Sequence, residues 1–384
     1  MLMVDISLTE EQISMQKMAR DFTKKEIVPI SKELDQAYEI KFNWEIYRKL
    51  AQKNFNALMI PERYGGAGLD CLSSTVIVEE LAVGCAAIAF TSASNFVTAF
   101  PIISAGNDEQ KDRFLPIFCD KVSPKLSGFA LTEPDAGSDV SGILTNARLT
   151  GENYLLNGRK CFISNAGLSS LYIVFAYTNK SLGVKGISAF IIPGDSEGIT
   201  IGKIENKMGF RASQTAELVL DNVSVPRSNL LGEEGRGFRI ALKGLDLARI
   251  VTGGAISVGV ARAAYEVALQ YSKERIQFGK SIFENQIISF MLADMIINIE
   301  AGRLLVWKAA YLMDRGLPFT RESAIAKVFS SDAAMKITTD AVQILGGYGY
   351  MKDYPVEKYM RDAKLLQIYD GTNQIQRVVI SNLL

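Results

Sequence analysis

The chain has 384 residues, 48% of them hydrophobic, and its 42 basic residues balance 42 acidic ones. This length suits two or three domains with more than one core, and a balanced charge gives no strong field for binding nucleic acid or an anionic membrane. The sequence contains no histidine. That excludes Ser-His-Asp and Cys-His catalysis and every His-ligated metal site, so we expect no metal and assign acid–base work to carboxylates, lysine or tyrosine.

The N-terminal stretch MLMVDISLTEEQ lacks the basic segment and apolar core of a signal peptide, and no unbroken apolar run has the ~18 residues of a spanning helix. We therefore expect a cytoplasmic protein with no membrane association. Neither the P-loop pattern nor G-x-G-x-x-G occurs. The cysteines have no C-x-x-C spacing and are expected to be reduced, mostly packed thiols: Cys71, Cys85, Cys119 and Cys161.

Residues 1–122 are expected to form an N-terminal α-helical domain. Thr9 to Gln12 has the pattern of a capping box, and apolar residues follow at helical spacing, namely Ile13, Ala19, Phe22 and Ile27. Similar helical patterns recur in the segments 43–55, 74–84 and 108–118.

Residues 123–233 are expected to form an antiparallel β-domain. Short alternating runs at 152–166, 171–178, 186–194 and 216–226 are separated by turn residues, and Asn157-Gly158 is a strong hairpin signal.

Residues 234–384 are expected to form a C-terminal four-helix bundle. Helical periodicity covers about 238–273, 285–314 and 320–345, with Gly316 and Gly346-Gly347 as stops. Near the end of the chain, DGTN interrupts the helical pattern at Asp370 before an amphipathic stretch resumes. Helices, then strands, then a bundle give an α+β fold rather than a doubly wound one.

Three features carry chemistry, each with an ordinary structural alternative. The segment FALTEPDAGSDV, residues 129–140, has small residues and hydroxyls suited to a flat polar ring or a phosphate, but the same residues are common in solvated turns. Asp246 and Arg249 are spaced i to i+3, as in surface pairs that stabilise helices. Arg275, taken alone, is most simply an exposed helix charge.

Five motifs in order, ALTEPDAGSD, GRKCFISNA, ERIQFGK, AVQILGGYGY and QIYDGTNQIQR, make nearly the whole chain similar to the flavin-dependent acyl-CoA dehydrogenase family. The resemblance implies an α-domain, a β-domain and a helical bundle assembled as a homotetramer, a dimer of dimers. It also implies FAD as cofactor, an acyl-CoA thioester as substrate and an electron-transfer flavoprotein as acceptor.

The resemblance assigns the cofactor residues to two groups. The first lines the flavin, with Leu131 and Thr132 at its pyrimidine edge, Ser138 near the pyrophosphate and the substrate, and Ser164 toward the flavin N5. Its members are Phe129, Leu131, Thr132, Gly137, Ser138, Phe162, Ile163 and Ser164. Phe162 stands where the family most often has tryptophan, which keeps the aromatic face and loses the N–H donor.

The second group would reach the FAD of a neighbouring subunit or complete the cradle, so the cofactor site would require a dimer. Arg275 would bind the pyrophosphate and residues 343–347 the adenylate end. Its members are Arg275, Phe278, Gln286, Gln343, Ile344, Gly346, Gly347, Thr372 and Gln374.

For the substrate, the resemblance implies contacts of Asp246 and Arg249 with the pantetheine and places Ser138, Tyr369 and Gly371 at the same site. Asp370 would be the base that removes the α-proton, and Gly371 N–H or the acid would face the thioester carbonyl. A helix cap is the structural alternative for Asp370. Ala248 occupies the other known base position and cannot serve.

Most relatives have glutamate where this chain has Asp370, whose reach is shorter by about 1.5 Å. Aspartate at this place resembles dehydrogenases of cyclohexane-1-carboxyl-CoA, so a short, branched or alicyclic acyl group is expected. Residues 89–100 would border a short, wide acyl pocket through Phe90, Phe96 and Phe100, although the same stripe suits core packing. The alternatives are a short- or branched-chain fatty acyl-CoA dehydrogenase, an enoyl-CoA reductase running in reverse, and a non-enzymatic acyl-CoA-binding relative.

Overall fold

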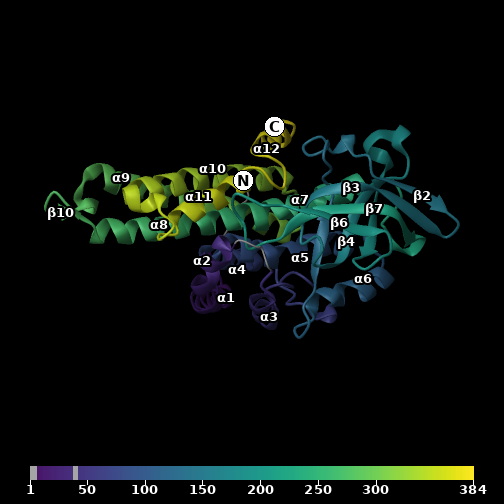
Figure 1. Cartoon of the computed structure of the whole chain (residues 1–384), viewed down its shortest axis with the longest axis horizontal. Coiled ribbons are helices and arrows are strands. Elements are labelled where there is room, and N and C mark those ends of the chain that lie inside the picture. The colour runs from purple at the N-terminus through teal and green to yellow at the C-terminus, as the bar shows by residue number, and fades with distance from the viewer. Residues whose placement is uncertain (1–6, 38–41) are drawn as a thin grey trace.

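The structure is a computed structural model that describes residues 7–37 and 42–384. A β-sheet region lies at one end of the molecule and a long helical bundle extends from it to the other end (Figure 1). The N-terminal helices pack along one side, where the bundle meets the sheet (Figure 1). This is the expected α+β architecture of helices, sheet and bundle.

The N-terminal region is helical, and its first helix starts at the predicted capping box. Thr9 Oγ1 accepts a hydrogen bond from Gln12 N at 3.2 Å, and Gln12 Oε1 accepts one from Thr9 N at 3.1 Å. Ala19 and Phe22 are buried, whereas Ile13 is 53% exposed. The helices are α1 (Glu10–Phe22, continued by a π-helical turn, Thr23–Ile27), α2 (Val28–Gln36), α3 (Trp44–Gln52), α4 (Cys71–Gly84), α5 (Ala86–Ala105) and α6 (Asp108–Phe114).

Two helical stretches, Ala86–Ala105 and Gly237–Glu274, are long and apolar enough on average to cross a membrane. Their most apolar windows are 89% and 94% buried inside the fold, as in core helices of a globular protein. The two segments were not expected from the sequence because polar residues interrupt their apolar runs, although their mean hydropathy is high. The four cysteines are free thiols, and Cys119 alone of the four is partly exposed.

The middle region is one mixed sheet of eight strands in the order β6-β7-β3-β2-β4-β5-β8, with β1 paired to β4. Most neighbours are antiparallel, but β4 runs parallel to both β1 and β2. The strands are β1 (Leu126–Ala130), β2 (Asn146–Thr150), β3 (Asn153–Ser164), β4 (Ser169–Tyr177), β5 (Ile187–Pro193), β6 (Ile199–Ile204), β7 (Thr215–Pro226) and β8 (Leu230–Leu231).

The hairpin prediction at Asn157-Gly158 is wrong, because both residues lie inside β3. The turn between β2 and β3 falls instead at Gly151, whose φ is 61°. Gly158 is there for space: a Cβ on it would lie 2.3 Å from Thr145 Oγ1. The glycine thus marks a close approach within the sheet rather than a reversal of the chain.

The C-terminal bundle contains the three long helices near their expected bounds. α7 (Gly237–Ala248) passes through a π-helical segment, Arg249–Ala255, into α8 (Ile256–Glu274). A hairpin of β9 (Ile276–Gln277) and β10 (Lys280–Ser281) leads into α9 (Gln286–Asp314), followed by α10 (Thr320–Leu345), α11 (Val356–Leu366) and α12 (Asn373–Ser381). Short 3₁₀ segments are Glu62–Tyr64, Leu115–Cys119, Val140–Gly142, Lys180–Gly186, Arg227–Asn229, Ile282–Glu284 and Gly346–Tyr350.

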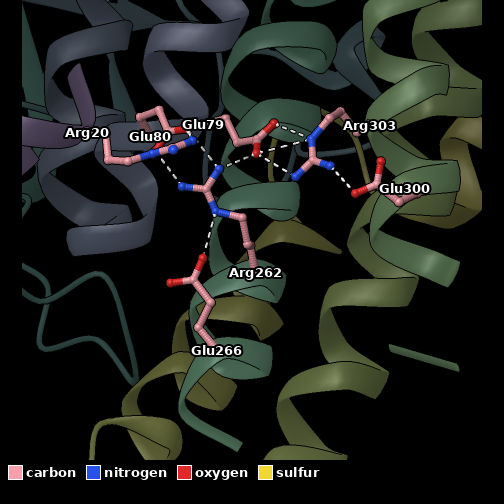
Figure 2. Close-up of polar contacts among 7 residues, drawn as sticks. All are labelled: Arg20, Glu79, Glu80, Arg262, Glu266, Glu300 and Arg303. Atoms are coloured by element: carbon pink, nitrogen blue, oxygen red, sulfur yellow. Dashed lines mark hydrogen bonds and ion pairs between the residues drawn. The ribbon is translucent and has the colours of Figure 1, made fainter. Parts of the chain in front are cut away.

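A buried charge network joins the N-terminal region to the bundle (Figure 2). Glu79 and Glu80 on α4 are only 2% and 1% exposed. Arg262 of α8 binds both carboxylates at 2.8 and 2.9 Å, while Arg303 of α9 adds a 2.9 Å bond to Glu79 and Arg20 of α1 a 2.8 Å bond to Glu80. Four helices are therefore held together by paired charges in the interior.

Candidate active site

The predicted interruption near the C-terminus lies between α11 and α12 and has a left-handed backbone. Asp370 has φ 55° and Gly371 φ 85°. Thr372 caps α12, since its hydroxyl oxygen accepts the hydrogen bond of Ile375 N at 3.2 Å. Asp370 is therefore not the helix cap. Left-handed backbone at a non-glycine residue costs about 1–3 kcal/mol and persists where surrounding contacts impose it.

Contacts from the bundle hold this loop in place. The Lys327 ammonium, on α10, donates to Gly371 O at 2.9 Å and to Asn373 Oδ1 at 2.8 Å. Gln376 Nε2 donates to Asp370 O at 3.0 Å. Lys327 is fully buried, and burial lowers its pKa to about 8. Lys327 was not predicted from sequence, because no local pattern links it to a loop more than 40 residues away.

The Asp370 carboxyl faces the π-helical segment of the bundle. Its Oδ2 lies 2.6 Å from the Thr252 hydroxyl, which donates to it. Burial raises the pKa of Asp370 above its usual value, and the Thr252 hydrogen bond and the cations Lys327 and Arg249 only partly oppose this. A partly buried carboxylate with a raised pKa is suited to accept a proton near neutral pH.

Aromatic rings border the same loop. The ring centroid of Tyr369 lies 5.4 Å from that of Phe90 and 6.0 Å from that of Phe210. Tyr369 also donates its hydroxyl hydrogen to Thr252 O at 2.6 Å. Of the three phenylalanines predicted for an acyl pocket, Phe90 thus lies next to Tyr369, whereas Phe96 is fully buried in the core. Phe210, in the connection between β6 and β7, was not predicted from sequence.

Asp246 and Arg249 form a pair that is buried rather than on the surface. They are 8% and 3% exposed, and Arg249 Nη1 donates to Asp246 Oδ1 at 2.5 Å. Thr320 Oγ1 donates to the other carboxylate oxygen at 2.6 Å. Arg249 Nε is buried and has no partner among the described residues. An unpartnered buried donor of this kind points to a group that is bound from outside the chain.

A second buried ion pair, between Lys160 and Glu133, holds the base of the predicted flavin loop, residues 131–139. Lys160 on β3 donates to Glu133 Oε1 at 2.8 Å and to Leu131 O at 3.1 Å, and both charged side chains are buried. Gly137 and Ser138, at the tip of the loop, are exposed. The loop therefore offers free polar groups on a rigid base, and its supporting pair was not predicted from sequence.

Residues at the end of β3 differ in how they face this loop. Phe162 is 63% exposed and has φ 57°, at a register shift between β3 and β7. Ile163 is 2% exposed and packs in the sheet core, so a ligand would meet its backbone rather than its side chain. Ser164 is half-buried. Phe129, at the end of β1, packs on Phe175 with ring centroids 4.8 Å apart.

The second predicted group is divided: part of it lies at the far end of the bundle and part lies near Asp370. A cavity of about 460 Å³ is lined by Arg275, Ile344, Gly346, Gly347 and Tyr348, among others. The Arg275 guanidinium lies 5.7 Å from the Tyr348 ring centre. Gln286 and Gln343 are exposed nearby in the chain but do not line this cavity, and Phe278, at the hairpin tip, is 99% exposed. Thr372 and Gln374 instead belong to the Asp370 loop and α12.

The part of the second group around Arg275 lies far from Asp370 within one chain. The helix from Thr252 to Arg275 is about 35 Å long at 1.5 Å per residue, and the β9–β10 hairpin and the sheet lie at opposite ends of the molecule (Figure 1). One extended dinucleotide does not span that length. If both groups bind the same cofactor, two copies of the chain must meet.

Comparison with known proteins gives the family. The models for the N-terminal, middle and C-terminal domains of acyl-CoA dehydrogenase match residues 9–121, 128–223 and 235–384. The chain belongs to the acyl-CoA dehydrogenase family and is an oxidoreductase acting on the CH–CH bond of acyl-CoA thioesters with FAD as cofactor. A solved FAD complex of PigA is 27% identical, with a TM-score of 0.93 and 99% of each chain covered.

Close relatives cover nearly the whole chain. A short-chain-specific acyl-CoA dehydrogenase of Megasphaera elsdenii is 47% identical, and acryloyl-CoA reductase (NADH) of Anaerotignum propionicum 43%; the matches cover 98% of this chain and 98% and 95% of theirs. Two solved structures, butyryl-CoA dehydrogenase from Megasphaera elsdenii and one described as the electron transferring flavoprotein of Acidaminococcus fermentans, have TM-scores of 0.95 and 0.96. Both are 46% identical, with 99% of each chain covered.

The residues present fit FAD at both groups. The exposed ring of Phe162 and the tip of the 131–139 loop offer a flat apolar surface beside polar groups. Arg275 supplies positive charge for a pyrophosphate, and a Cβ at Gly346 or Gly347 would meet no atom within 4 Å, so the backbone there is open to a ligand. No group of three or more possible metal ligands occurs among the described residues.

Proposed function

We propose that this enzyme removes the α-proton and a β-hydride from a short, branched or alicyclic acyl-CoA, with Asp370 as the base. The observation that carries the proposal is the half-buried Asp370 carboxyl, held at a break between two helices and hydrogen-bonded to Thr252 at 2.6 Å. Burial raises its pKa. A carboxylate in this environment takes a proton from carbon more readily than a solvated one does.

Each residue of the site has one task in this reaction. Asp370 accepts H⁺ from Cα, and the backbone N–H of Gly371 or of Asp370 donates to the thioester carbonyl oxygen, where negative charge grows. Arg249 and Asp246, with Ser138, bind the pantetheine part. Bound FAD would supply the acceptor for the hydride that leaves Cβ. Tyr369, Phe90 and Phe210 exclude water beside the acid, and this exclusion keeps its pKa raised.

The best candidate substrate is cyclohexane-1-carboxyl-CoA. Its ring is branched at Cα, and such a substrate can bring its α-proton closer to the short side chain of Asp370 than a straight chain does. The aromatic border formed by Phe90, Phe210 and Tyr369 suits a compact apolar group. A straight short chain is the second candidate, because relatives with about half their residues identical are described as short-chain-specific.

Direction and electron partner form a second part of the proposal. We infer that electrons pass to an electron-transfer flavoprotein, since a similar solved structure is described by that partner. A relative is described as an acryloyl-CoA reductase, which favours enoyl-CoA reduction as the alternative direction. The redox potential of the bound cofactor, measured with and without thioester, separates these two. The Arg275 cavity and the 131–139 loop lie at opposite ends of the molecule, so we also propose that two chains share each FAD site. The resemblance to the family extends this proposal to a homotetramer, a dimer of dimers.

The test is an anaerobic titration of the purified yellow protein with cyclohexane-1-carboxyl-CoA, butyryl-CoA and octanoyl-CoA, following loss of the oxidised flavin absorbance. The ring thioester is expected to bleach the flavin fastest. Faster bleaching by butyryl-CoA would overturn the ring substrate and leave the short-chain candidate. Asp370→Asn is expected to keep FAD bound and to abolish bleaching by every thioester. Bleaching of Asp370→Asn at the original rate would overturn Asp370 as the base.

A further inference from the structure

We propose that Thr252 is a positioning residue for the base: its hydroxyl holds one oxygen of the Asp370 carboxyl and leaves the other oxygen to receive the α-proton. The inference rests on the proposed function of Asp370. It adds a residue outside the motifs that identify the family, on a segment of the bundle that no sequence motif connects with the C-terminal loop.

The two carboxylate oxygens of Asp370 have different surroundings. Oδ2 of Asp370 lies 2.6 Å from Thr252 Oγ1. Oδ1 accepts no hydrogen bond from any residue that the structure describes. A carboxyl group fixed through one oxygen has a fixed plane, so the free oxygen has a defined direction. Oδ2 is thus the anchored oxygen, and Oδ1 is the oxygen available for a proton.

The Thr252 hydroxyl has one hydrogen and lies within hydrogen-bonding distance of two acceptor oxygens. Its oxygen lies 2.6 Å from Asp370 Oδ2 and 2.7 Å from Ala248 O. An ionised carboxylate is the stronger acceptor, so the hydroxyl donates to Asp370 before proton abstraction. Once Asp370 has taken the proton, the hydroxyl can turn to Ala248 O. It therefore favours the carboxylate form without being left unsatisfied in the acid form.

Thr252 is itself held in place, as a residue that positions another must be. Thr252 belongs to the π-helical segment Arg249–Ala255, an irregularity often found at functional sites. Its backbone carbonyl accepts the Tyr369 hydroxyl at 2.6 Å, and it is 1% exposed. A β-branched side chain also has few rotamers. The neighbouring Gly253 lets Lys327 approach, since a Cβ there would lie 2.8 Å from Lys327 Cγ.

The charges around Asp370 set the sign of the expected pH effect. Arg249 from the same segment and Lys327 from α10 face it, and Tyr369 precedes it in the loop. All three remain in Thr252→Val. The Thr252 hydrogen bond lowers the pKa of Asp370, so its loss raises that pKa and moves the acidic limb of the activity profile to higher pH. Lys327, with a pKa of about 8, titrates on the alkaline side and is distinguishable.

The experiment compares Thr252→Val, Thr252→Ser and Thr338→Val with the wild type as FAD-loaded enzymes. Thr338 is the matched control, because its buried hydroxyl also donates to the carbonyl four residues earlier, at 2.8 Å, without contacting Asp370. The rate of flavin reduction is measured in single turnovers across pH, with the thioester that reduces the wild type. We expect Thr252→Val to be ~10–100-fold slower with unchanged thioester affinity, since small misplacements of a catalytic group have such effects.

A second readout does not depend on turnover. An acyl-CoA with sulfur in place of Cβ can lose its α-proton to the base but has no β-hydride to give, and its anion beside oxidised flavin produces a long-wavelength absorbance band. The pH midpoint of this band should move upward in Thr252→Val. It should stay near the wild-type value in Thr252→Ser and Thr338→Val. If Thr252→Val purifies without FAD, Thr252→Ala is measured in its place and the same results are expected.

A wild-type rate and an unshifted midpoint in Thr252→Val would overturn the positioning role. So would failure of Thr252→Ser to restore the rate, because the effect would then follow shape rather than the hydroxyl. Asp370→Asn separates this outcome from failure of the proposed function. If Asp370→Asn is inactive and Thr252→Val is normal, only the role of Thr252 is wrong.

Discussion

The ammonium of Lys327 lies 2.9 Å from the carbonyl oxygen of Gly371, so a bundle helix holds the loop that carries Asp370. The two residues are 44 positions apart in the chain. This bond satisfies a carbonyl in a loop whose left-handed backbone cannot pair as a helix would. It also places a positive charge near the Asp370 carboxylate.

Lys327→Met is expected to slow flavin reduction by at least ~10-fold, because the loop loses a hydrogen bond that positions the base. The cation lowers the pKa of Asp370, so that pKa should rise in the variant. The pH profile of flavin reduction in the wild type should include a change near the Lys327 pKa of about 8, and this change should be absent from Lys327→Met. The measurement is single-turnover flavin reduction across pH. Lys336→Met, which removes an exposed lysine of α10 paired with Asp340, is the control and should behave as wild type.

Asp370→Glu is expected to change which thioester is oxidised. The added methylene extends the carboxyl by about 1.5 Å, so a straight-chain α-proton comes within reach while a ring substrate is crowded. Butyryl-CoA turnover should therefore rise relative to cyclohexane-1-carboxyl-CoA turnover, measured side by side with an artificial acceptor. An unchanged ratio would show that the length of the acid does not set the preference.

Arg275→Met is expected to weaken FAD binding at least ~10-fold, since a charge-assisted contact is lost. A subunit-exchange experiment then shows whether Arg275 completes the FAD site of its own chain or that of the partner. Mixed Asp370→Asn and Arg275→Met dimers should recover activity, because one of their two sites has both an intact Asp370 and a partner's intact Arg275. If Arg275 served its own chain, both sites of the mixed dimer would be defective. Arg315→Met, at another exposed arginine, serves as the control.

Arg262→Met is expected to destabilise the fold by ~3–5 kcal/mol, because Glu79 and Glu80 lose a buried partner. Burial raises the pKa of Glu80, but hydrogen bonds from Arg262 and Arg20 outweigh burial, and the net pKa is lowered. The wild type thus has stability from Glu80 above its unfolded pKa, near 4.5, that is lost as pH falls below it. Urea unfolding at pH 7 and pH 4 should show a smaller pH difference in the variant, with Arg321→Met as a surface control.

Much of the architecture followed from local pattern. The long helices of the bundle have strong periodicity and glycine stops, and they begin and end near their predicted residues. The capping box at Thr9 and the break at Asp370 are also set by neighbouring residues. The turn prediction at Asn157-Gly158 was wrong, because Gly158 is required there by the close approach of Thr145 from another segment and not by a reversal of the chain. The boundaries at residues 122 and 233, and the cytoplasmic location, stay predictions.

The sequence by itself determined the family, the fold class and the candidate base, because these depend on motifs and periodicities that are continuous along the chain. Only the tertiary structure decided that Asp246 and Arg249 are buried, that Lys160 and Glu133 support the loop of residues 131–139, and that Thr252 contacts Asp370. Those contacts join residues from different elements, and burial and pKa depend on what packs around a group rather than on its neighbours in the chain.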